Sequence, residues 1–114
     1  MDRMPASTMP RSFLMLPISF EFYPPKTDEQ RLQLDRSVQK LKAYAPQVMS
    51  VTFGAGGSTL SHTPETVQRL RSEHGVAGVP HITCVGGSRE EIRQLLKLYR
   101  ALGCDRVVAL RGDT

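Results

Sequence analysis

The feature that most constrains the fold of this chain is a regular alternation of strand-like and helix-like segments. Short runs of alternating apolar and polar residues predict strands at 18–22, 48–53, 79–84 and 106–110, so a strand recurs about every 30 residues. Between them, apolar residues at helical spacing predict three helices, which begin near Thr27, Thr63 and Ser88. Strands that alternate with helices pair in parallel through right-handed crossovers. The sequence therefore predicts an open doubly wound sheet or part of a (β/α)8 barrel.

The side-chain pattern of the strands favours the barrel. In the first strand Phe20 and Phe22 oppose Glu21, and in the fourth Leu110 opposes Arg111. Central strands of an open parallel sheet are apolar on both faces, because helices cover both. Barrel strands have one face toward the helices and one toward the interior. We therefore expect the apolar residues to face the helices and the polar or small ones, Arg111 included, to face the interior.

The length bounds how much of a barrel can form. A (β/α)8 barrel typically needs about 250 residues, and the chain has 114. We expect an α/β fold of the TIM-barrel family with only about the first four β/α units. Residues 17–114 are predicted to form this amino-terminal half, after a flexible leader at 1–16.

Composition excludes several function classes. The chain has 15 Lys and Arg residues against 11 Asp and Glu residues, for a net charge of +4, but the two signs are interleaved. This is typical of a solvated surface, so no nucleic-acid partner is expected. Cys84 and Cys104 form no CxxC motif and have no His at metal spacing, so no metal site is predicted. The longest apolar run is too short to span a membrane. We expect a cytoplasmic protein with no membrane partner.

Candidate catalytic groups follow from the barrel topology, because working residues gather at the carboxyl ends of barrel strands. The candidates there are Glu21, Thr52, His81, Arg111 and Asp113. Desolvation inside a barrel can keep a carboxyl group protonated near neutral pH, which would suit Glu21 as a general acid. An ion pair between Glu21 and Arg111 across the interior is equally compatible with the spacing.

The histidines have simpler interpretations. His81 lies within a predicted strand and is expected to be a hydrogen-bonded interior residue rather than a base. His62 and His74 flank the second predicted helix and are expected at the surface. They do not form an HExxH pair, which again argues against a metal.

Four segments at the ends of the four predicted strands together resemble the methylenetetrahydrofolate reductase family, over nearly the whole chain from Ile18 to Asp113. They are Ser19-Phe-Glu-Phe-Tyr-Pro-Pro25, Ser50-Val-Thr-Phe-Gly-Ala-Gly-Gly-Ser58, Pro80-His-Ile-Thr-Cys84 and Ala109-Leu-Arg-Gly-Asp113. The resemblance implies a barrel that binds FAD at its carboxyl-terminal mouth. It further implies reduction of 5,10-methylenetetrahydrofolate to 5-methyltetrahydrofolate with NADH or NADPH, a step of one-carbon metabolism and methionine synthesis.

The resemblance also implies roles for individual residues. Glu21 matches the family's general acid, and Asp113 matches a carboxylate near the flavin and the pterin; both would be catalytic and contact the folate substrate. The positions that match the flavin or nicotinamide site are Thr52, Phe53, Ala55, His81, Arg111, Gly112 and Asp113. Phe53 stands where many members have Tyr, so a hydroxyl contact would be absent while the stacking surface remains.

The family's second half-barrel has no counterpart in these 114 residues, so we expect little activity from them alone. We expect that the chain either forms a homo-oligomer or needs the missing half of the barrel. Two alternatives stay open. The chain could be a non-catalytic truncated remnant, or a half-barrel that associates with itself to bury its strand edges. It could also be a small flavodoxin-like module that binds flavin without turnover.

Overall fold

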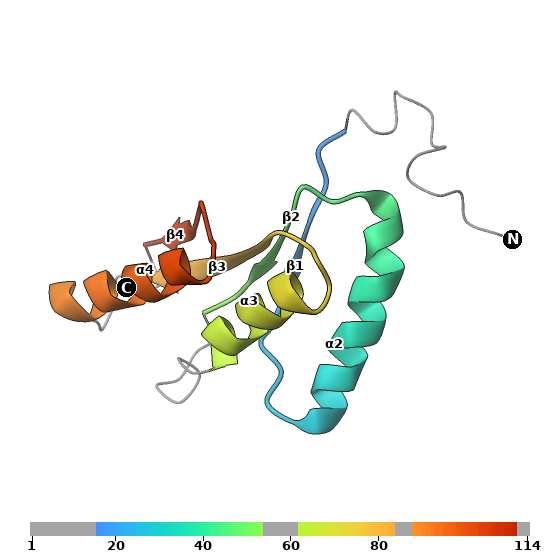
Figure 1. Cartoon of the computed structure of the whole chain (residues 1–114), viewed down its shortest axis with the longest axis horizontal. Coiled ribbons are helices and arrows are strands. Elements are labelled where there is room, and N and C mark those ends of the chain that lie inside the picture. Colours follow the sequence, from blue (N-terminus) through green and yellow to red (C-terminus); the bar gives the residue numbers. More distant parts are fainter. Residues whose placement is uncertain (1–15, 54–61, 84–87, 112–114) are drawn as a thin grey trace, which may run out of the picture.

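A computed structural model describes residues 16–53, 62–83 and 88–111 of the chain (Figure 1). It confirms the predicted alternation of strands and helices. In chain order the elements are β1 (Ser19–Phe22), α2 (Asp28–Leu41), the short 3-10 helix η2 (Lys42–Tyr44), β2 (Val48–Val51), α3 (His62–Ser72), β3 (Gly78–Thr83), α4 (Arg89–Ala101) and β4 (Val108–Leu110). The first, second and fourth strands are shorter than predicted.

Helix starts were predictable because their signals are local. The Thr27 side chain caps α2 by accepting a hydrogen bond from the backbone N–H of Gln30, and Ser88 caps α4 by accepting one from Glu91. Each cap satisfies one of the backbone donors that the first turn of a helix leaves free. Gly103 follows α4 with a φ of 92°, a left-handed conformation that suits glycine at a helix end.

All four strands are parallel, and their order in the sheet is β1-β2-β3-β4. Each new strand is therefore added at the same edge. Right-handed crossovers that all move in one direction place all the helices on one face of the sheet. A doubly wound sheet instead reverses its strand order at a switch point and carries helices on both faces. The observed order thus disfavours the flavodoxin-like alternative.

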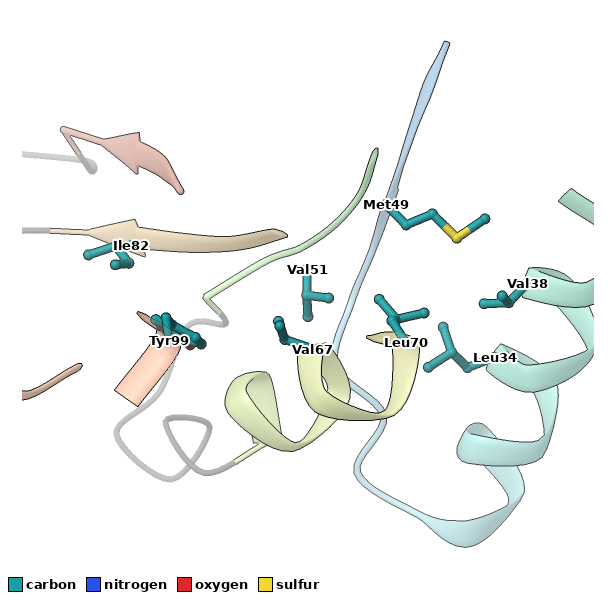
Figure 2. Close-up of a cluster of buried hydrophobic side chains, with 8 residues drawn as sticks. All are labelled: Leu34, Val38, Met49, Val51, Val67, Leu70, Ile82 and Tyr99. Carbon is teal, nitrogen blue, oxygen red and sulfur yellow. The ribbon is translucent and has the colours of Figure 1, made fainter. Parts of the chain in front are cut away.

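The hydrophobic core lies between the sheet and these helices, as Figure 2 shows. Met49 and Val51 of β2 extend toward side chains of α2 and α3, and Ile82 of β3 lies beside Tyr99 of α4. The buried cluster consists of Leu34, Val38, Met49, Val51, Val67, Leu70, Ile82 and Tyr99. Burial of this apolar stripe from each helix is the main force that fixes the helices on the sheet.

Gly78 shows how closely α3 approaches the sheet. A Cβ atom at this first position of β3 would lie 3.1 Å from both the Leu70 Cβ and the Val67 carbonyl oxygen. Glycine at this position therefore allows the helix backbone to come within contact distance of the strand.

The opposite face of the sheet carries the polar residues of the first three strands. Directly paired residues of parallel strands share a face. Glu21 pairs with Ser50 and Ser50 with Val79, while His81 pairs with Val108 and Thr83 with Leu110. The prediction that polar residues of β1 to β3 face away from the helices is thus confirmed.

The predicted faces of β4 were wrong. The register places Val108 and Leu110 on the face of His81 and Thr83, whereas Ala109 pairs with Ile82 on the helix-covered face. The physical reason is that β4 has only three residues, two of them exposed. Since neither face of this strand is well buried, its apolar pattern carries no information about orientation.

Candidate active site

A hollow of about 680 Å³ opens at the carboxyl ends of the strands. Its lining residues come from β1, β3 and β4, from the segments that follow β1 and β2, and from the start of α2. They are Glu21, Tyr23, Pro24, Lys26, Gln30, Thr52, Phe53, His81, Thr83 and Leu110. The strand ends thus bring Glu21, Thr52 and His81 to one hollow.

Glu21 and His81 lie next to each other in this hollow. The Glu21 Oε1 atom lies 3.4 Å from the His81 Nε2 atom, an ion pair when the imidazole is protonated. His81 is buried, as expected of an interior residue, whereas the Glu21 side chain is 58% exposed. The described residues thus bury the imidazole but leave the Glu21 carboxyl group largely open to solvent.

Arg111 does not join this pair. Among the described residues, the charged partner of Glu21 is His81 rather than Arg111, so the predicted ion pair between Glu21 and Arg111 is wrong. Arg111 is exposed and is not part of the described lining of the hollow. The reversed face of β4 explains this, because it brings Leu110 rather than Arg111 to the hollow.

Thr52 and Phe53 form the wall that follows β2. The Thr52 backbone N–H donates to the Phe22 carbonyl at 2.9 Å, and the Thr52 carbonyl accepts a hydrogen bond from the Thr63 hydroxyl at 2.9 Å. These two bonds tie the wall to β1 and to the start of α3. The Thr52 Oγ1 atom is buried and has no hydrogen-bond partner among the described residues. A buried hydroxyl without a partner is costly, and a ligand can supply one.

Other sequence-predicted site residues lie outside the described residues. They are Ala55, Gly112 and Asp113. Conversely, sequence reasoning missed several lining residues: Tyr23, Pro24, Lys26, Gln30, Thr83 and Leu110. The alternation of β1 contained a signal for one of them, because Tyr23 lies two positions beyond Glu21 and so shares its face.

A second polar cluster lies on the helix side, where His74 is 7% exposed. The prediction that His74 is a surface residue was therefore wrong. Its Nε2 atom lies 2.8 Å from an Asp35 carboxylate oxygen, and its Nδ1 atom lies 2.9 Å from the Gln39 side-chain nitrogen. Because the Gln39 amide nitrogen can only donate, Nδ1 accepts and Nε2–H donates to Asp35. These contacts tie the end of α3 to α2.

Arg69 completes this cluster. It contacts Asp35 at 2.7 Å and Glu73 at 3.1 Å. Burial opposes the charge of Arg69, but the hydrogen bonds and charges of Glu73 and Asp35 outweigh it and raise the pKa of the guanidinium. Ligand atoms of Asp35, Glu73 and His74 lie within 4.8 Å of one another, as a metal site would need. However, Arg69 already supplies the positive charge there, so the cluster is explained as a structural one.

Cys104 is half-buried and packs against the core, in line with the expectation of a small interior residue. Burial raises the pKa of its thiol, although the nearby Arg71 opposes the shift. Cys84 lies outside the described residues. None of the described helices is long and apolar enough to cross a membrane.

Comparison with known proteins agrees with the arrangement of the strand ends. The family model described as "Methylenetetrahydrofolate reductase" matches residues 14–114. The chain belongs to the methylenetetrahydrofolate reductase family. This membership confirms the resemblance seen in the four strand-end segments and identifies the chain as related to oxidoreductases of folate metabolism.

Relatives in the family include bacterial and plant proteins. The chain is 35% identical over 96 residues to 5,10-methylenetetrahydrofolate reductase of Pectobacterium carotovorum subsp. carotovorum. This aligned segment covers 84% of the chain and 32% of the relative. It is 41% identical over 95 residues to the protein of the same name from Buchnera aphidicola subsp. Schizaphis graminum, covering 83% and 32%. It is 39% identical over 95 residues to Methylenetetrahydrofolate reductase (NADH) 1 of Arabidopsis thaliana, covering 83% and 16%. The chain thus spans about a third of the length of these bacterial reductases.

Proposed function

We propose that this chain forms the amino-terminal part of a (β/α)8 barrel that binds FAD and reduces 5,10-methylenetetrahydrofolate to 5-methyltetrahydrofolate with NADH or NADPH. The observation that carries the proposal is the Glu21–His81 pair in a hollow built from the carboxyl ends of parallel strands. Family membership supports the reaction class. The sequential strand order, with helices on one face, supports the barrel.

Further β/α units would complete the site. The hollow is open, and Leu110 at its β4 side is exposed. We propose that a longer polypeptide or a second chain supplies these units in a cytoplasmic enzyme, and that the assembled protein is a homo-oligomer. In such an assembly the added strands would enclose Glu21 and exclude water from the reaction, which strengthens its electrostatic interactions.

The described residues fit a flavin. Phe53 and Leu110 offer apolar surface to a flat ring, and the Thr52 hydroxyl lacks a partner among the described residues. When bound, FAD would supply the chemistry that carries a hydride from the nicotinamide to the folate. Thr52, Phe53 and His81 would hold it from the described strands. By family match, the remaining contacts would come from Ala55, Arg111, Gly112 and Asp113.

Glu21 would act on the folate as the general acid. Its carboxyl group would give a proton to the substrate nitrogen that leaves as the methylene bridge opens, which produces an iminium cation. The Asp113 carboxylate would stabilise this cation electrostatically. A hydride added to the iminium carbon completes the methyl group. His81 lies 3.4 Å from Glu21, so a protonated imidazole there could return the proton to the carboxylate.

A chimera tests this function. Residues 14–114 of this chain would replace the matching segment of the Pectobacterium reductase, and bound FAD would be measured by absorbance. We expect Glu21→Gln to lower folate reduction by about 10²- to 10⁴-fold, the usual range for loss of a general acid. Oxidation of NADH by an artificial quinone through the same flavin should persist, since that half-reaction needs no acid for ring opening.

The matched control is Glu29→Gln, which removes an exposed carboxylate of α2 that does not line the hollow. Its activity should equal that of the unmodified chimera. Full folate turnover by the Glu21→Gln chimera would exclude Glu21 as the acid. A chimera that holds FAD and oxidises NADH but never reduces folate would contradict the proposed reaction for this segment.

A further inference from the structure

The outer rim of the hollow carries an aromatic ring with no packing role in the described fold. Tyr23 is 81% exposed, the largest exposure among the exposed large hydrophobic residues of the described chain, although it lines the same hollow as Glu21 and Phe53. Leaving an aromatic ring in water forfeits the favourable free energy of its burial. The ring is therefore available to pack against a ligand.

The backbone holds this ring in place. Pro24 and Pro25 follow Tyr23 directly and are both buried. Proline fixes its own φ angle and also restricts the residue before it to extended conformations. Tyr23 thus projects from a stiff extended segment, and little backbone entropy would be lost when its ring stacks on a ligand.

A cation lies on the same rim. Lys26 lines the hollow just before α2. Its backbone N–H donates to the Gln30 side-chain oxygen at 2.8 Å, and the Gln30 backbone N–H donates to the Thr27 hydroxyl at 3.1 Å. These bonds fix the backbone at Lys26, while its long side chain is exposed. The Lys26 ammonium group thus extends from an ordered backbone that lines the same hollow as the exposed ring.

The charges of the hollow give it a polarity. Among the described lining residues, the exposed Lys26 lies just before α2, and Glu21 lies on β1 next to the buried His81. A carboxylate or phosphate is attracted by the positive charge of Lys26, whereas the carboxyl group of Glu21 offers it no favourable charge. An elongated ligand would therefore enter with its anionic end at the rim and its uncharged reactive end at Glu21.

We propose that Tyr23 and Lys26 form a binding subsite for an aromatic ring that carries a carboxylate or phosphate group. Tyr23 stacks on the ring, and Lys26 pairs with the anion. The subsite rests on the proposed function only for the source of its ligand. The benzoylglutamate portion of a folate and the adenylate portion of a nicotinamide dinucleotide both combine an aromatic ring with an anionic group. Binding itself needs neither flavin nor reaction.

The test uses the full chain and small probes with NMR detection of the Tyr23 and Lys26 signals. The two probes are p-aminobenzoylglutamate for the folate source and adenosine monophosphate for the dinucleotide source. We expect the probe from the true source to bind more tightly. Tyr23→Leu should raise the Kd of that probe by about two- to tenfold, as expected for loss of an aromatic contact. Tyr23→Phe, which keeps the ring, should bind like the unmodified chain.

Charge is tested separately. Lys26→Gln should weaken binding by about two- to fivefold at low salt, and the difference should shrink in 1 M salt. Lys26→Arg should preserve binding, and Lys97→Gln on the exposed face of α4 is the matched control. The uncharged ring of p-aminobenzamide should be insensitive to Lys26→Gln.

Two results would overturn the subsite: neither probe binds, or Tyr23→Leu and Lys26→Gln both bind like the unmodified chain. These outcomes are distinguishable from failure of the proposed function. A chimera that reduces folate with unchanged KM values after both substitutions rejects the subsite and keeps the reaction. Probe binding that depends on Tyr23 and Lys26, without folate turnover by the chimera, rejects the reaction and keeps the subsite.

Discussion

The two faces of the sheet differ in how much of their side-chain surface is exposed to water. On the helix-covered face, Val51, Val67 and Leu70 are fully buried in one continuous core. On the other face, Glu21 and Tyr23 are largely exposed around a hollow. Parallel sheets normally have both faces covered. The contrast indicates that packing on the covered face stabilises the fold, while the open face is available to bind a ligand or to pack against further structure.

This division predicts that stability and function respond to different substitutions. Truncation of a core side chain costs its transfer free energy and leaves a cavity. Substitution of an exposed residue away from such features usually changes stability by less than about 0.5 kcal/mol. The exposed residues of the open face, Glu21 and Tyr23 among them, should therefore be replaceable with little loss of folding free energy, as the Glu21→Gln and Tyr23→Leu experiments require.

The largest effect on folding is expected for Leu70→Ala. Leu70 of α3 is fully buried between β2 and α2. The variant should lose about 2 to 5 kcal/mol of unfolding free energy, measured by urea denaturation of the chain. Leu32→Ala on α2 is the matched control, because that side chain is 56% exposed. Equal losses from the two substitutions would show that the helix-covered face does not form the core described above.

A smaller effect is expected for His74→Leu, which tests the polar contact between α2 and α3. The substitution leaves the Gln39 amide and one Asp35 oxygen without their partner. Gln39 is exposed and Asp35 is half-buried, so water replaces part of the lost contact. The loss should be about 0.5 to 1.5 kcal/mol, the net contribution of a typical intramolecular hydrogen bond. A double-mutant cycle with Gln39→Leu measures the coupling directly. Additive losses in that cycle would mean that the hydrogen bond contributes nothing, and His62→Leu at the start of α3 controls for the change in hydrophobicity.

The same contrast explains how much the sequence could predict. The helix starts at Thr27 and Ser88 follow from capping groups within three residues of one another. The convergence of Glu21, Thr52 and His81 was predictable because parallel strands end at the same edge of a sheet. The meeting of these three residues in one hollow therefore needed only local patterns and one topological rule.

Contacts that depend on long-range packing were not predictable in this way. His74 meets Asp35 across 39 residues of sequence, and no local pattern indicates which helix faces meet. The face of β4 was predicted wrongly because an exposed three-residue strand has no buried side to set its register. The role of Lys26 at the hollow depends on where α2 begins relative to the strand ends, which is a property of the assembled sheet.

The smallest effect on stability at neutral pH is expected for Tyr99→Phe. This substitution keeps the buried ring and removes only the buried hydroxyl group. The Tyr99 hydroxyl is buried and has no hydrogen-bond partner among the described residues. Removing it should leave the unfolding free energy unchanged or raise it by up to about 1 kcal/mol. The effect should grow in alkali. Burial, with a smaller contribution from Cys104, raises the pKa of Tyr99 above its ordinary value of 10.0.

The sign of this pH effect follows from proton linkage. Above pH 10 the phenol ionises in the unfolded chain but stays protonated in the folded one, so the unfolded state binds fewer protons and stability falls as pH rises. Tyr99→Phe should remove this part of the alkaline loss in urea titrations at pH 8 to 11.5. Cys104 contributes a separate loss that begins near its ordinary pKa of 9.0, and Cys104→Ala isolates it. If the unmodified chain and Tyr99→Phe lose stability in parallel above pH 10, the hydroxyl is in contact with water, and the core beneath β3 is looser than the helix-covered face requires.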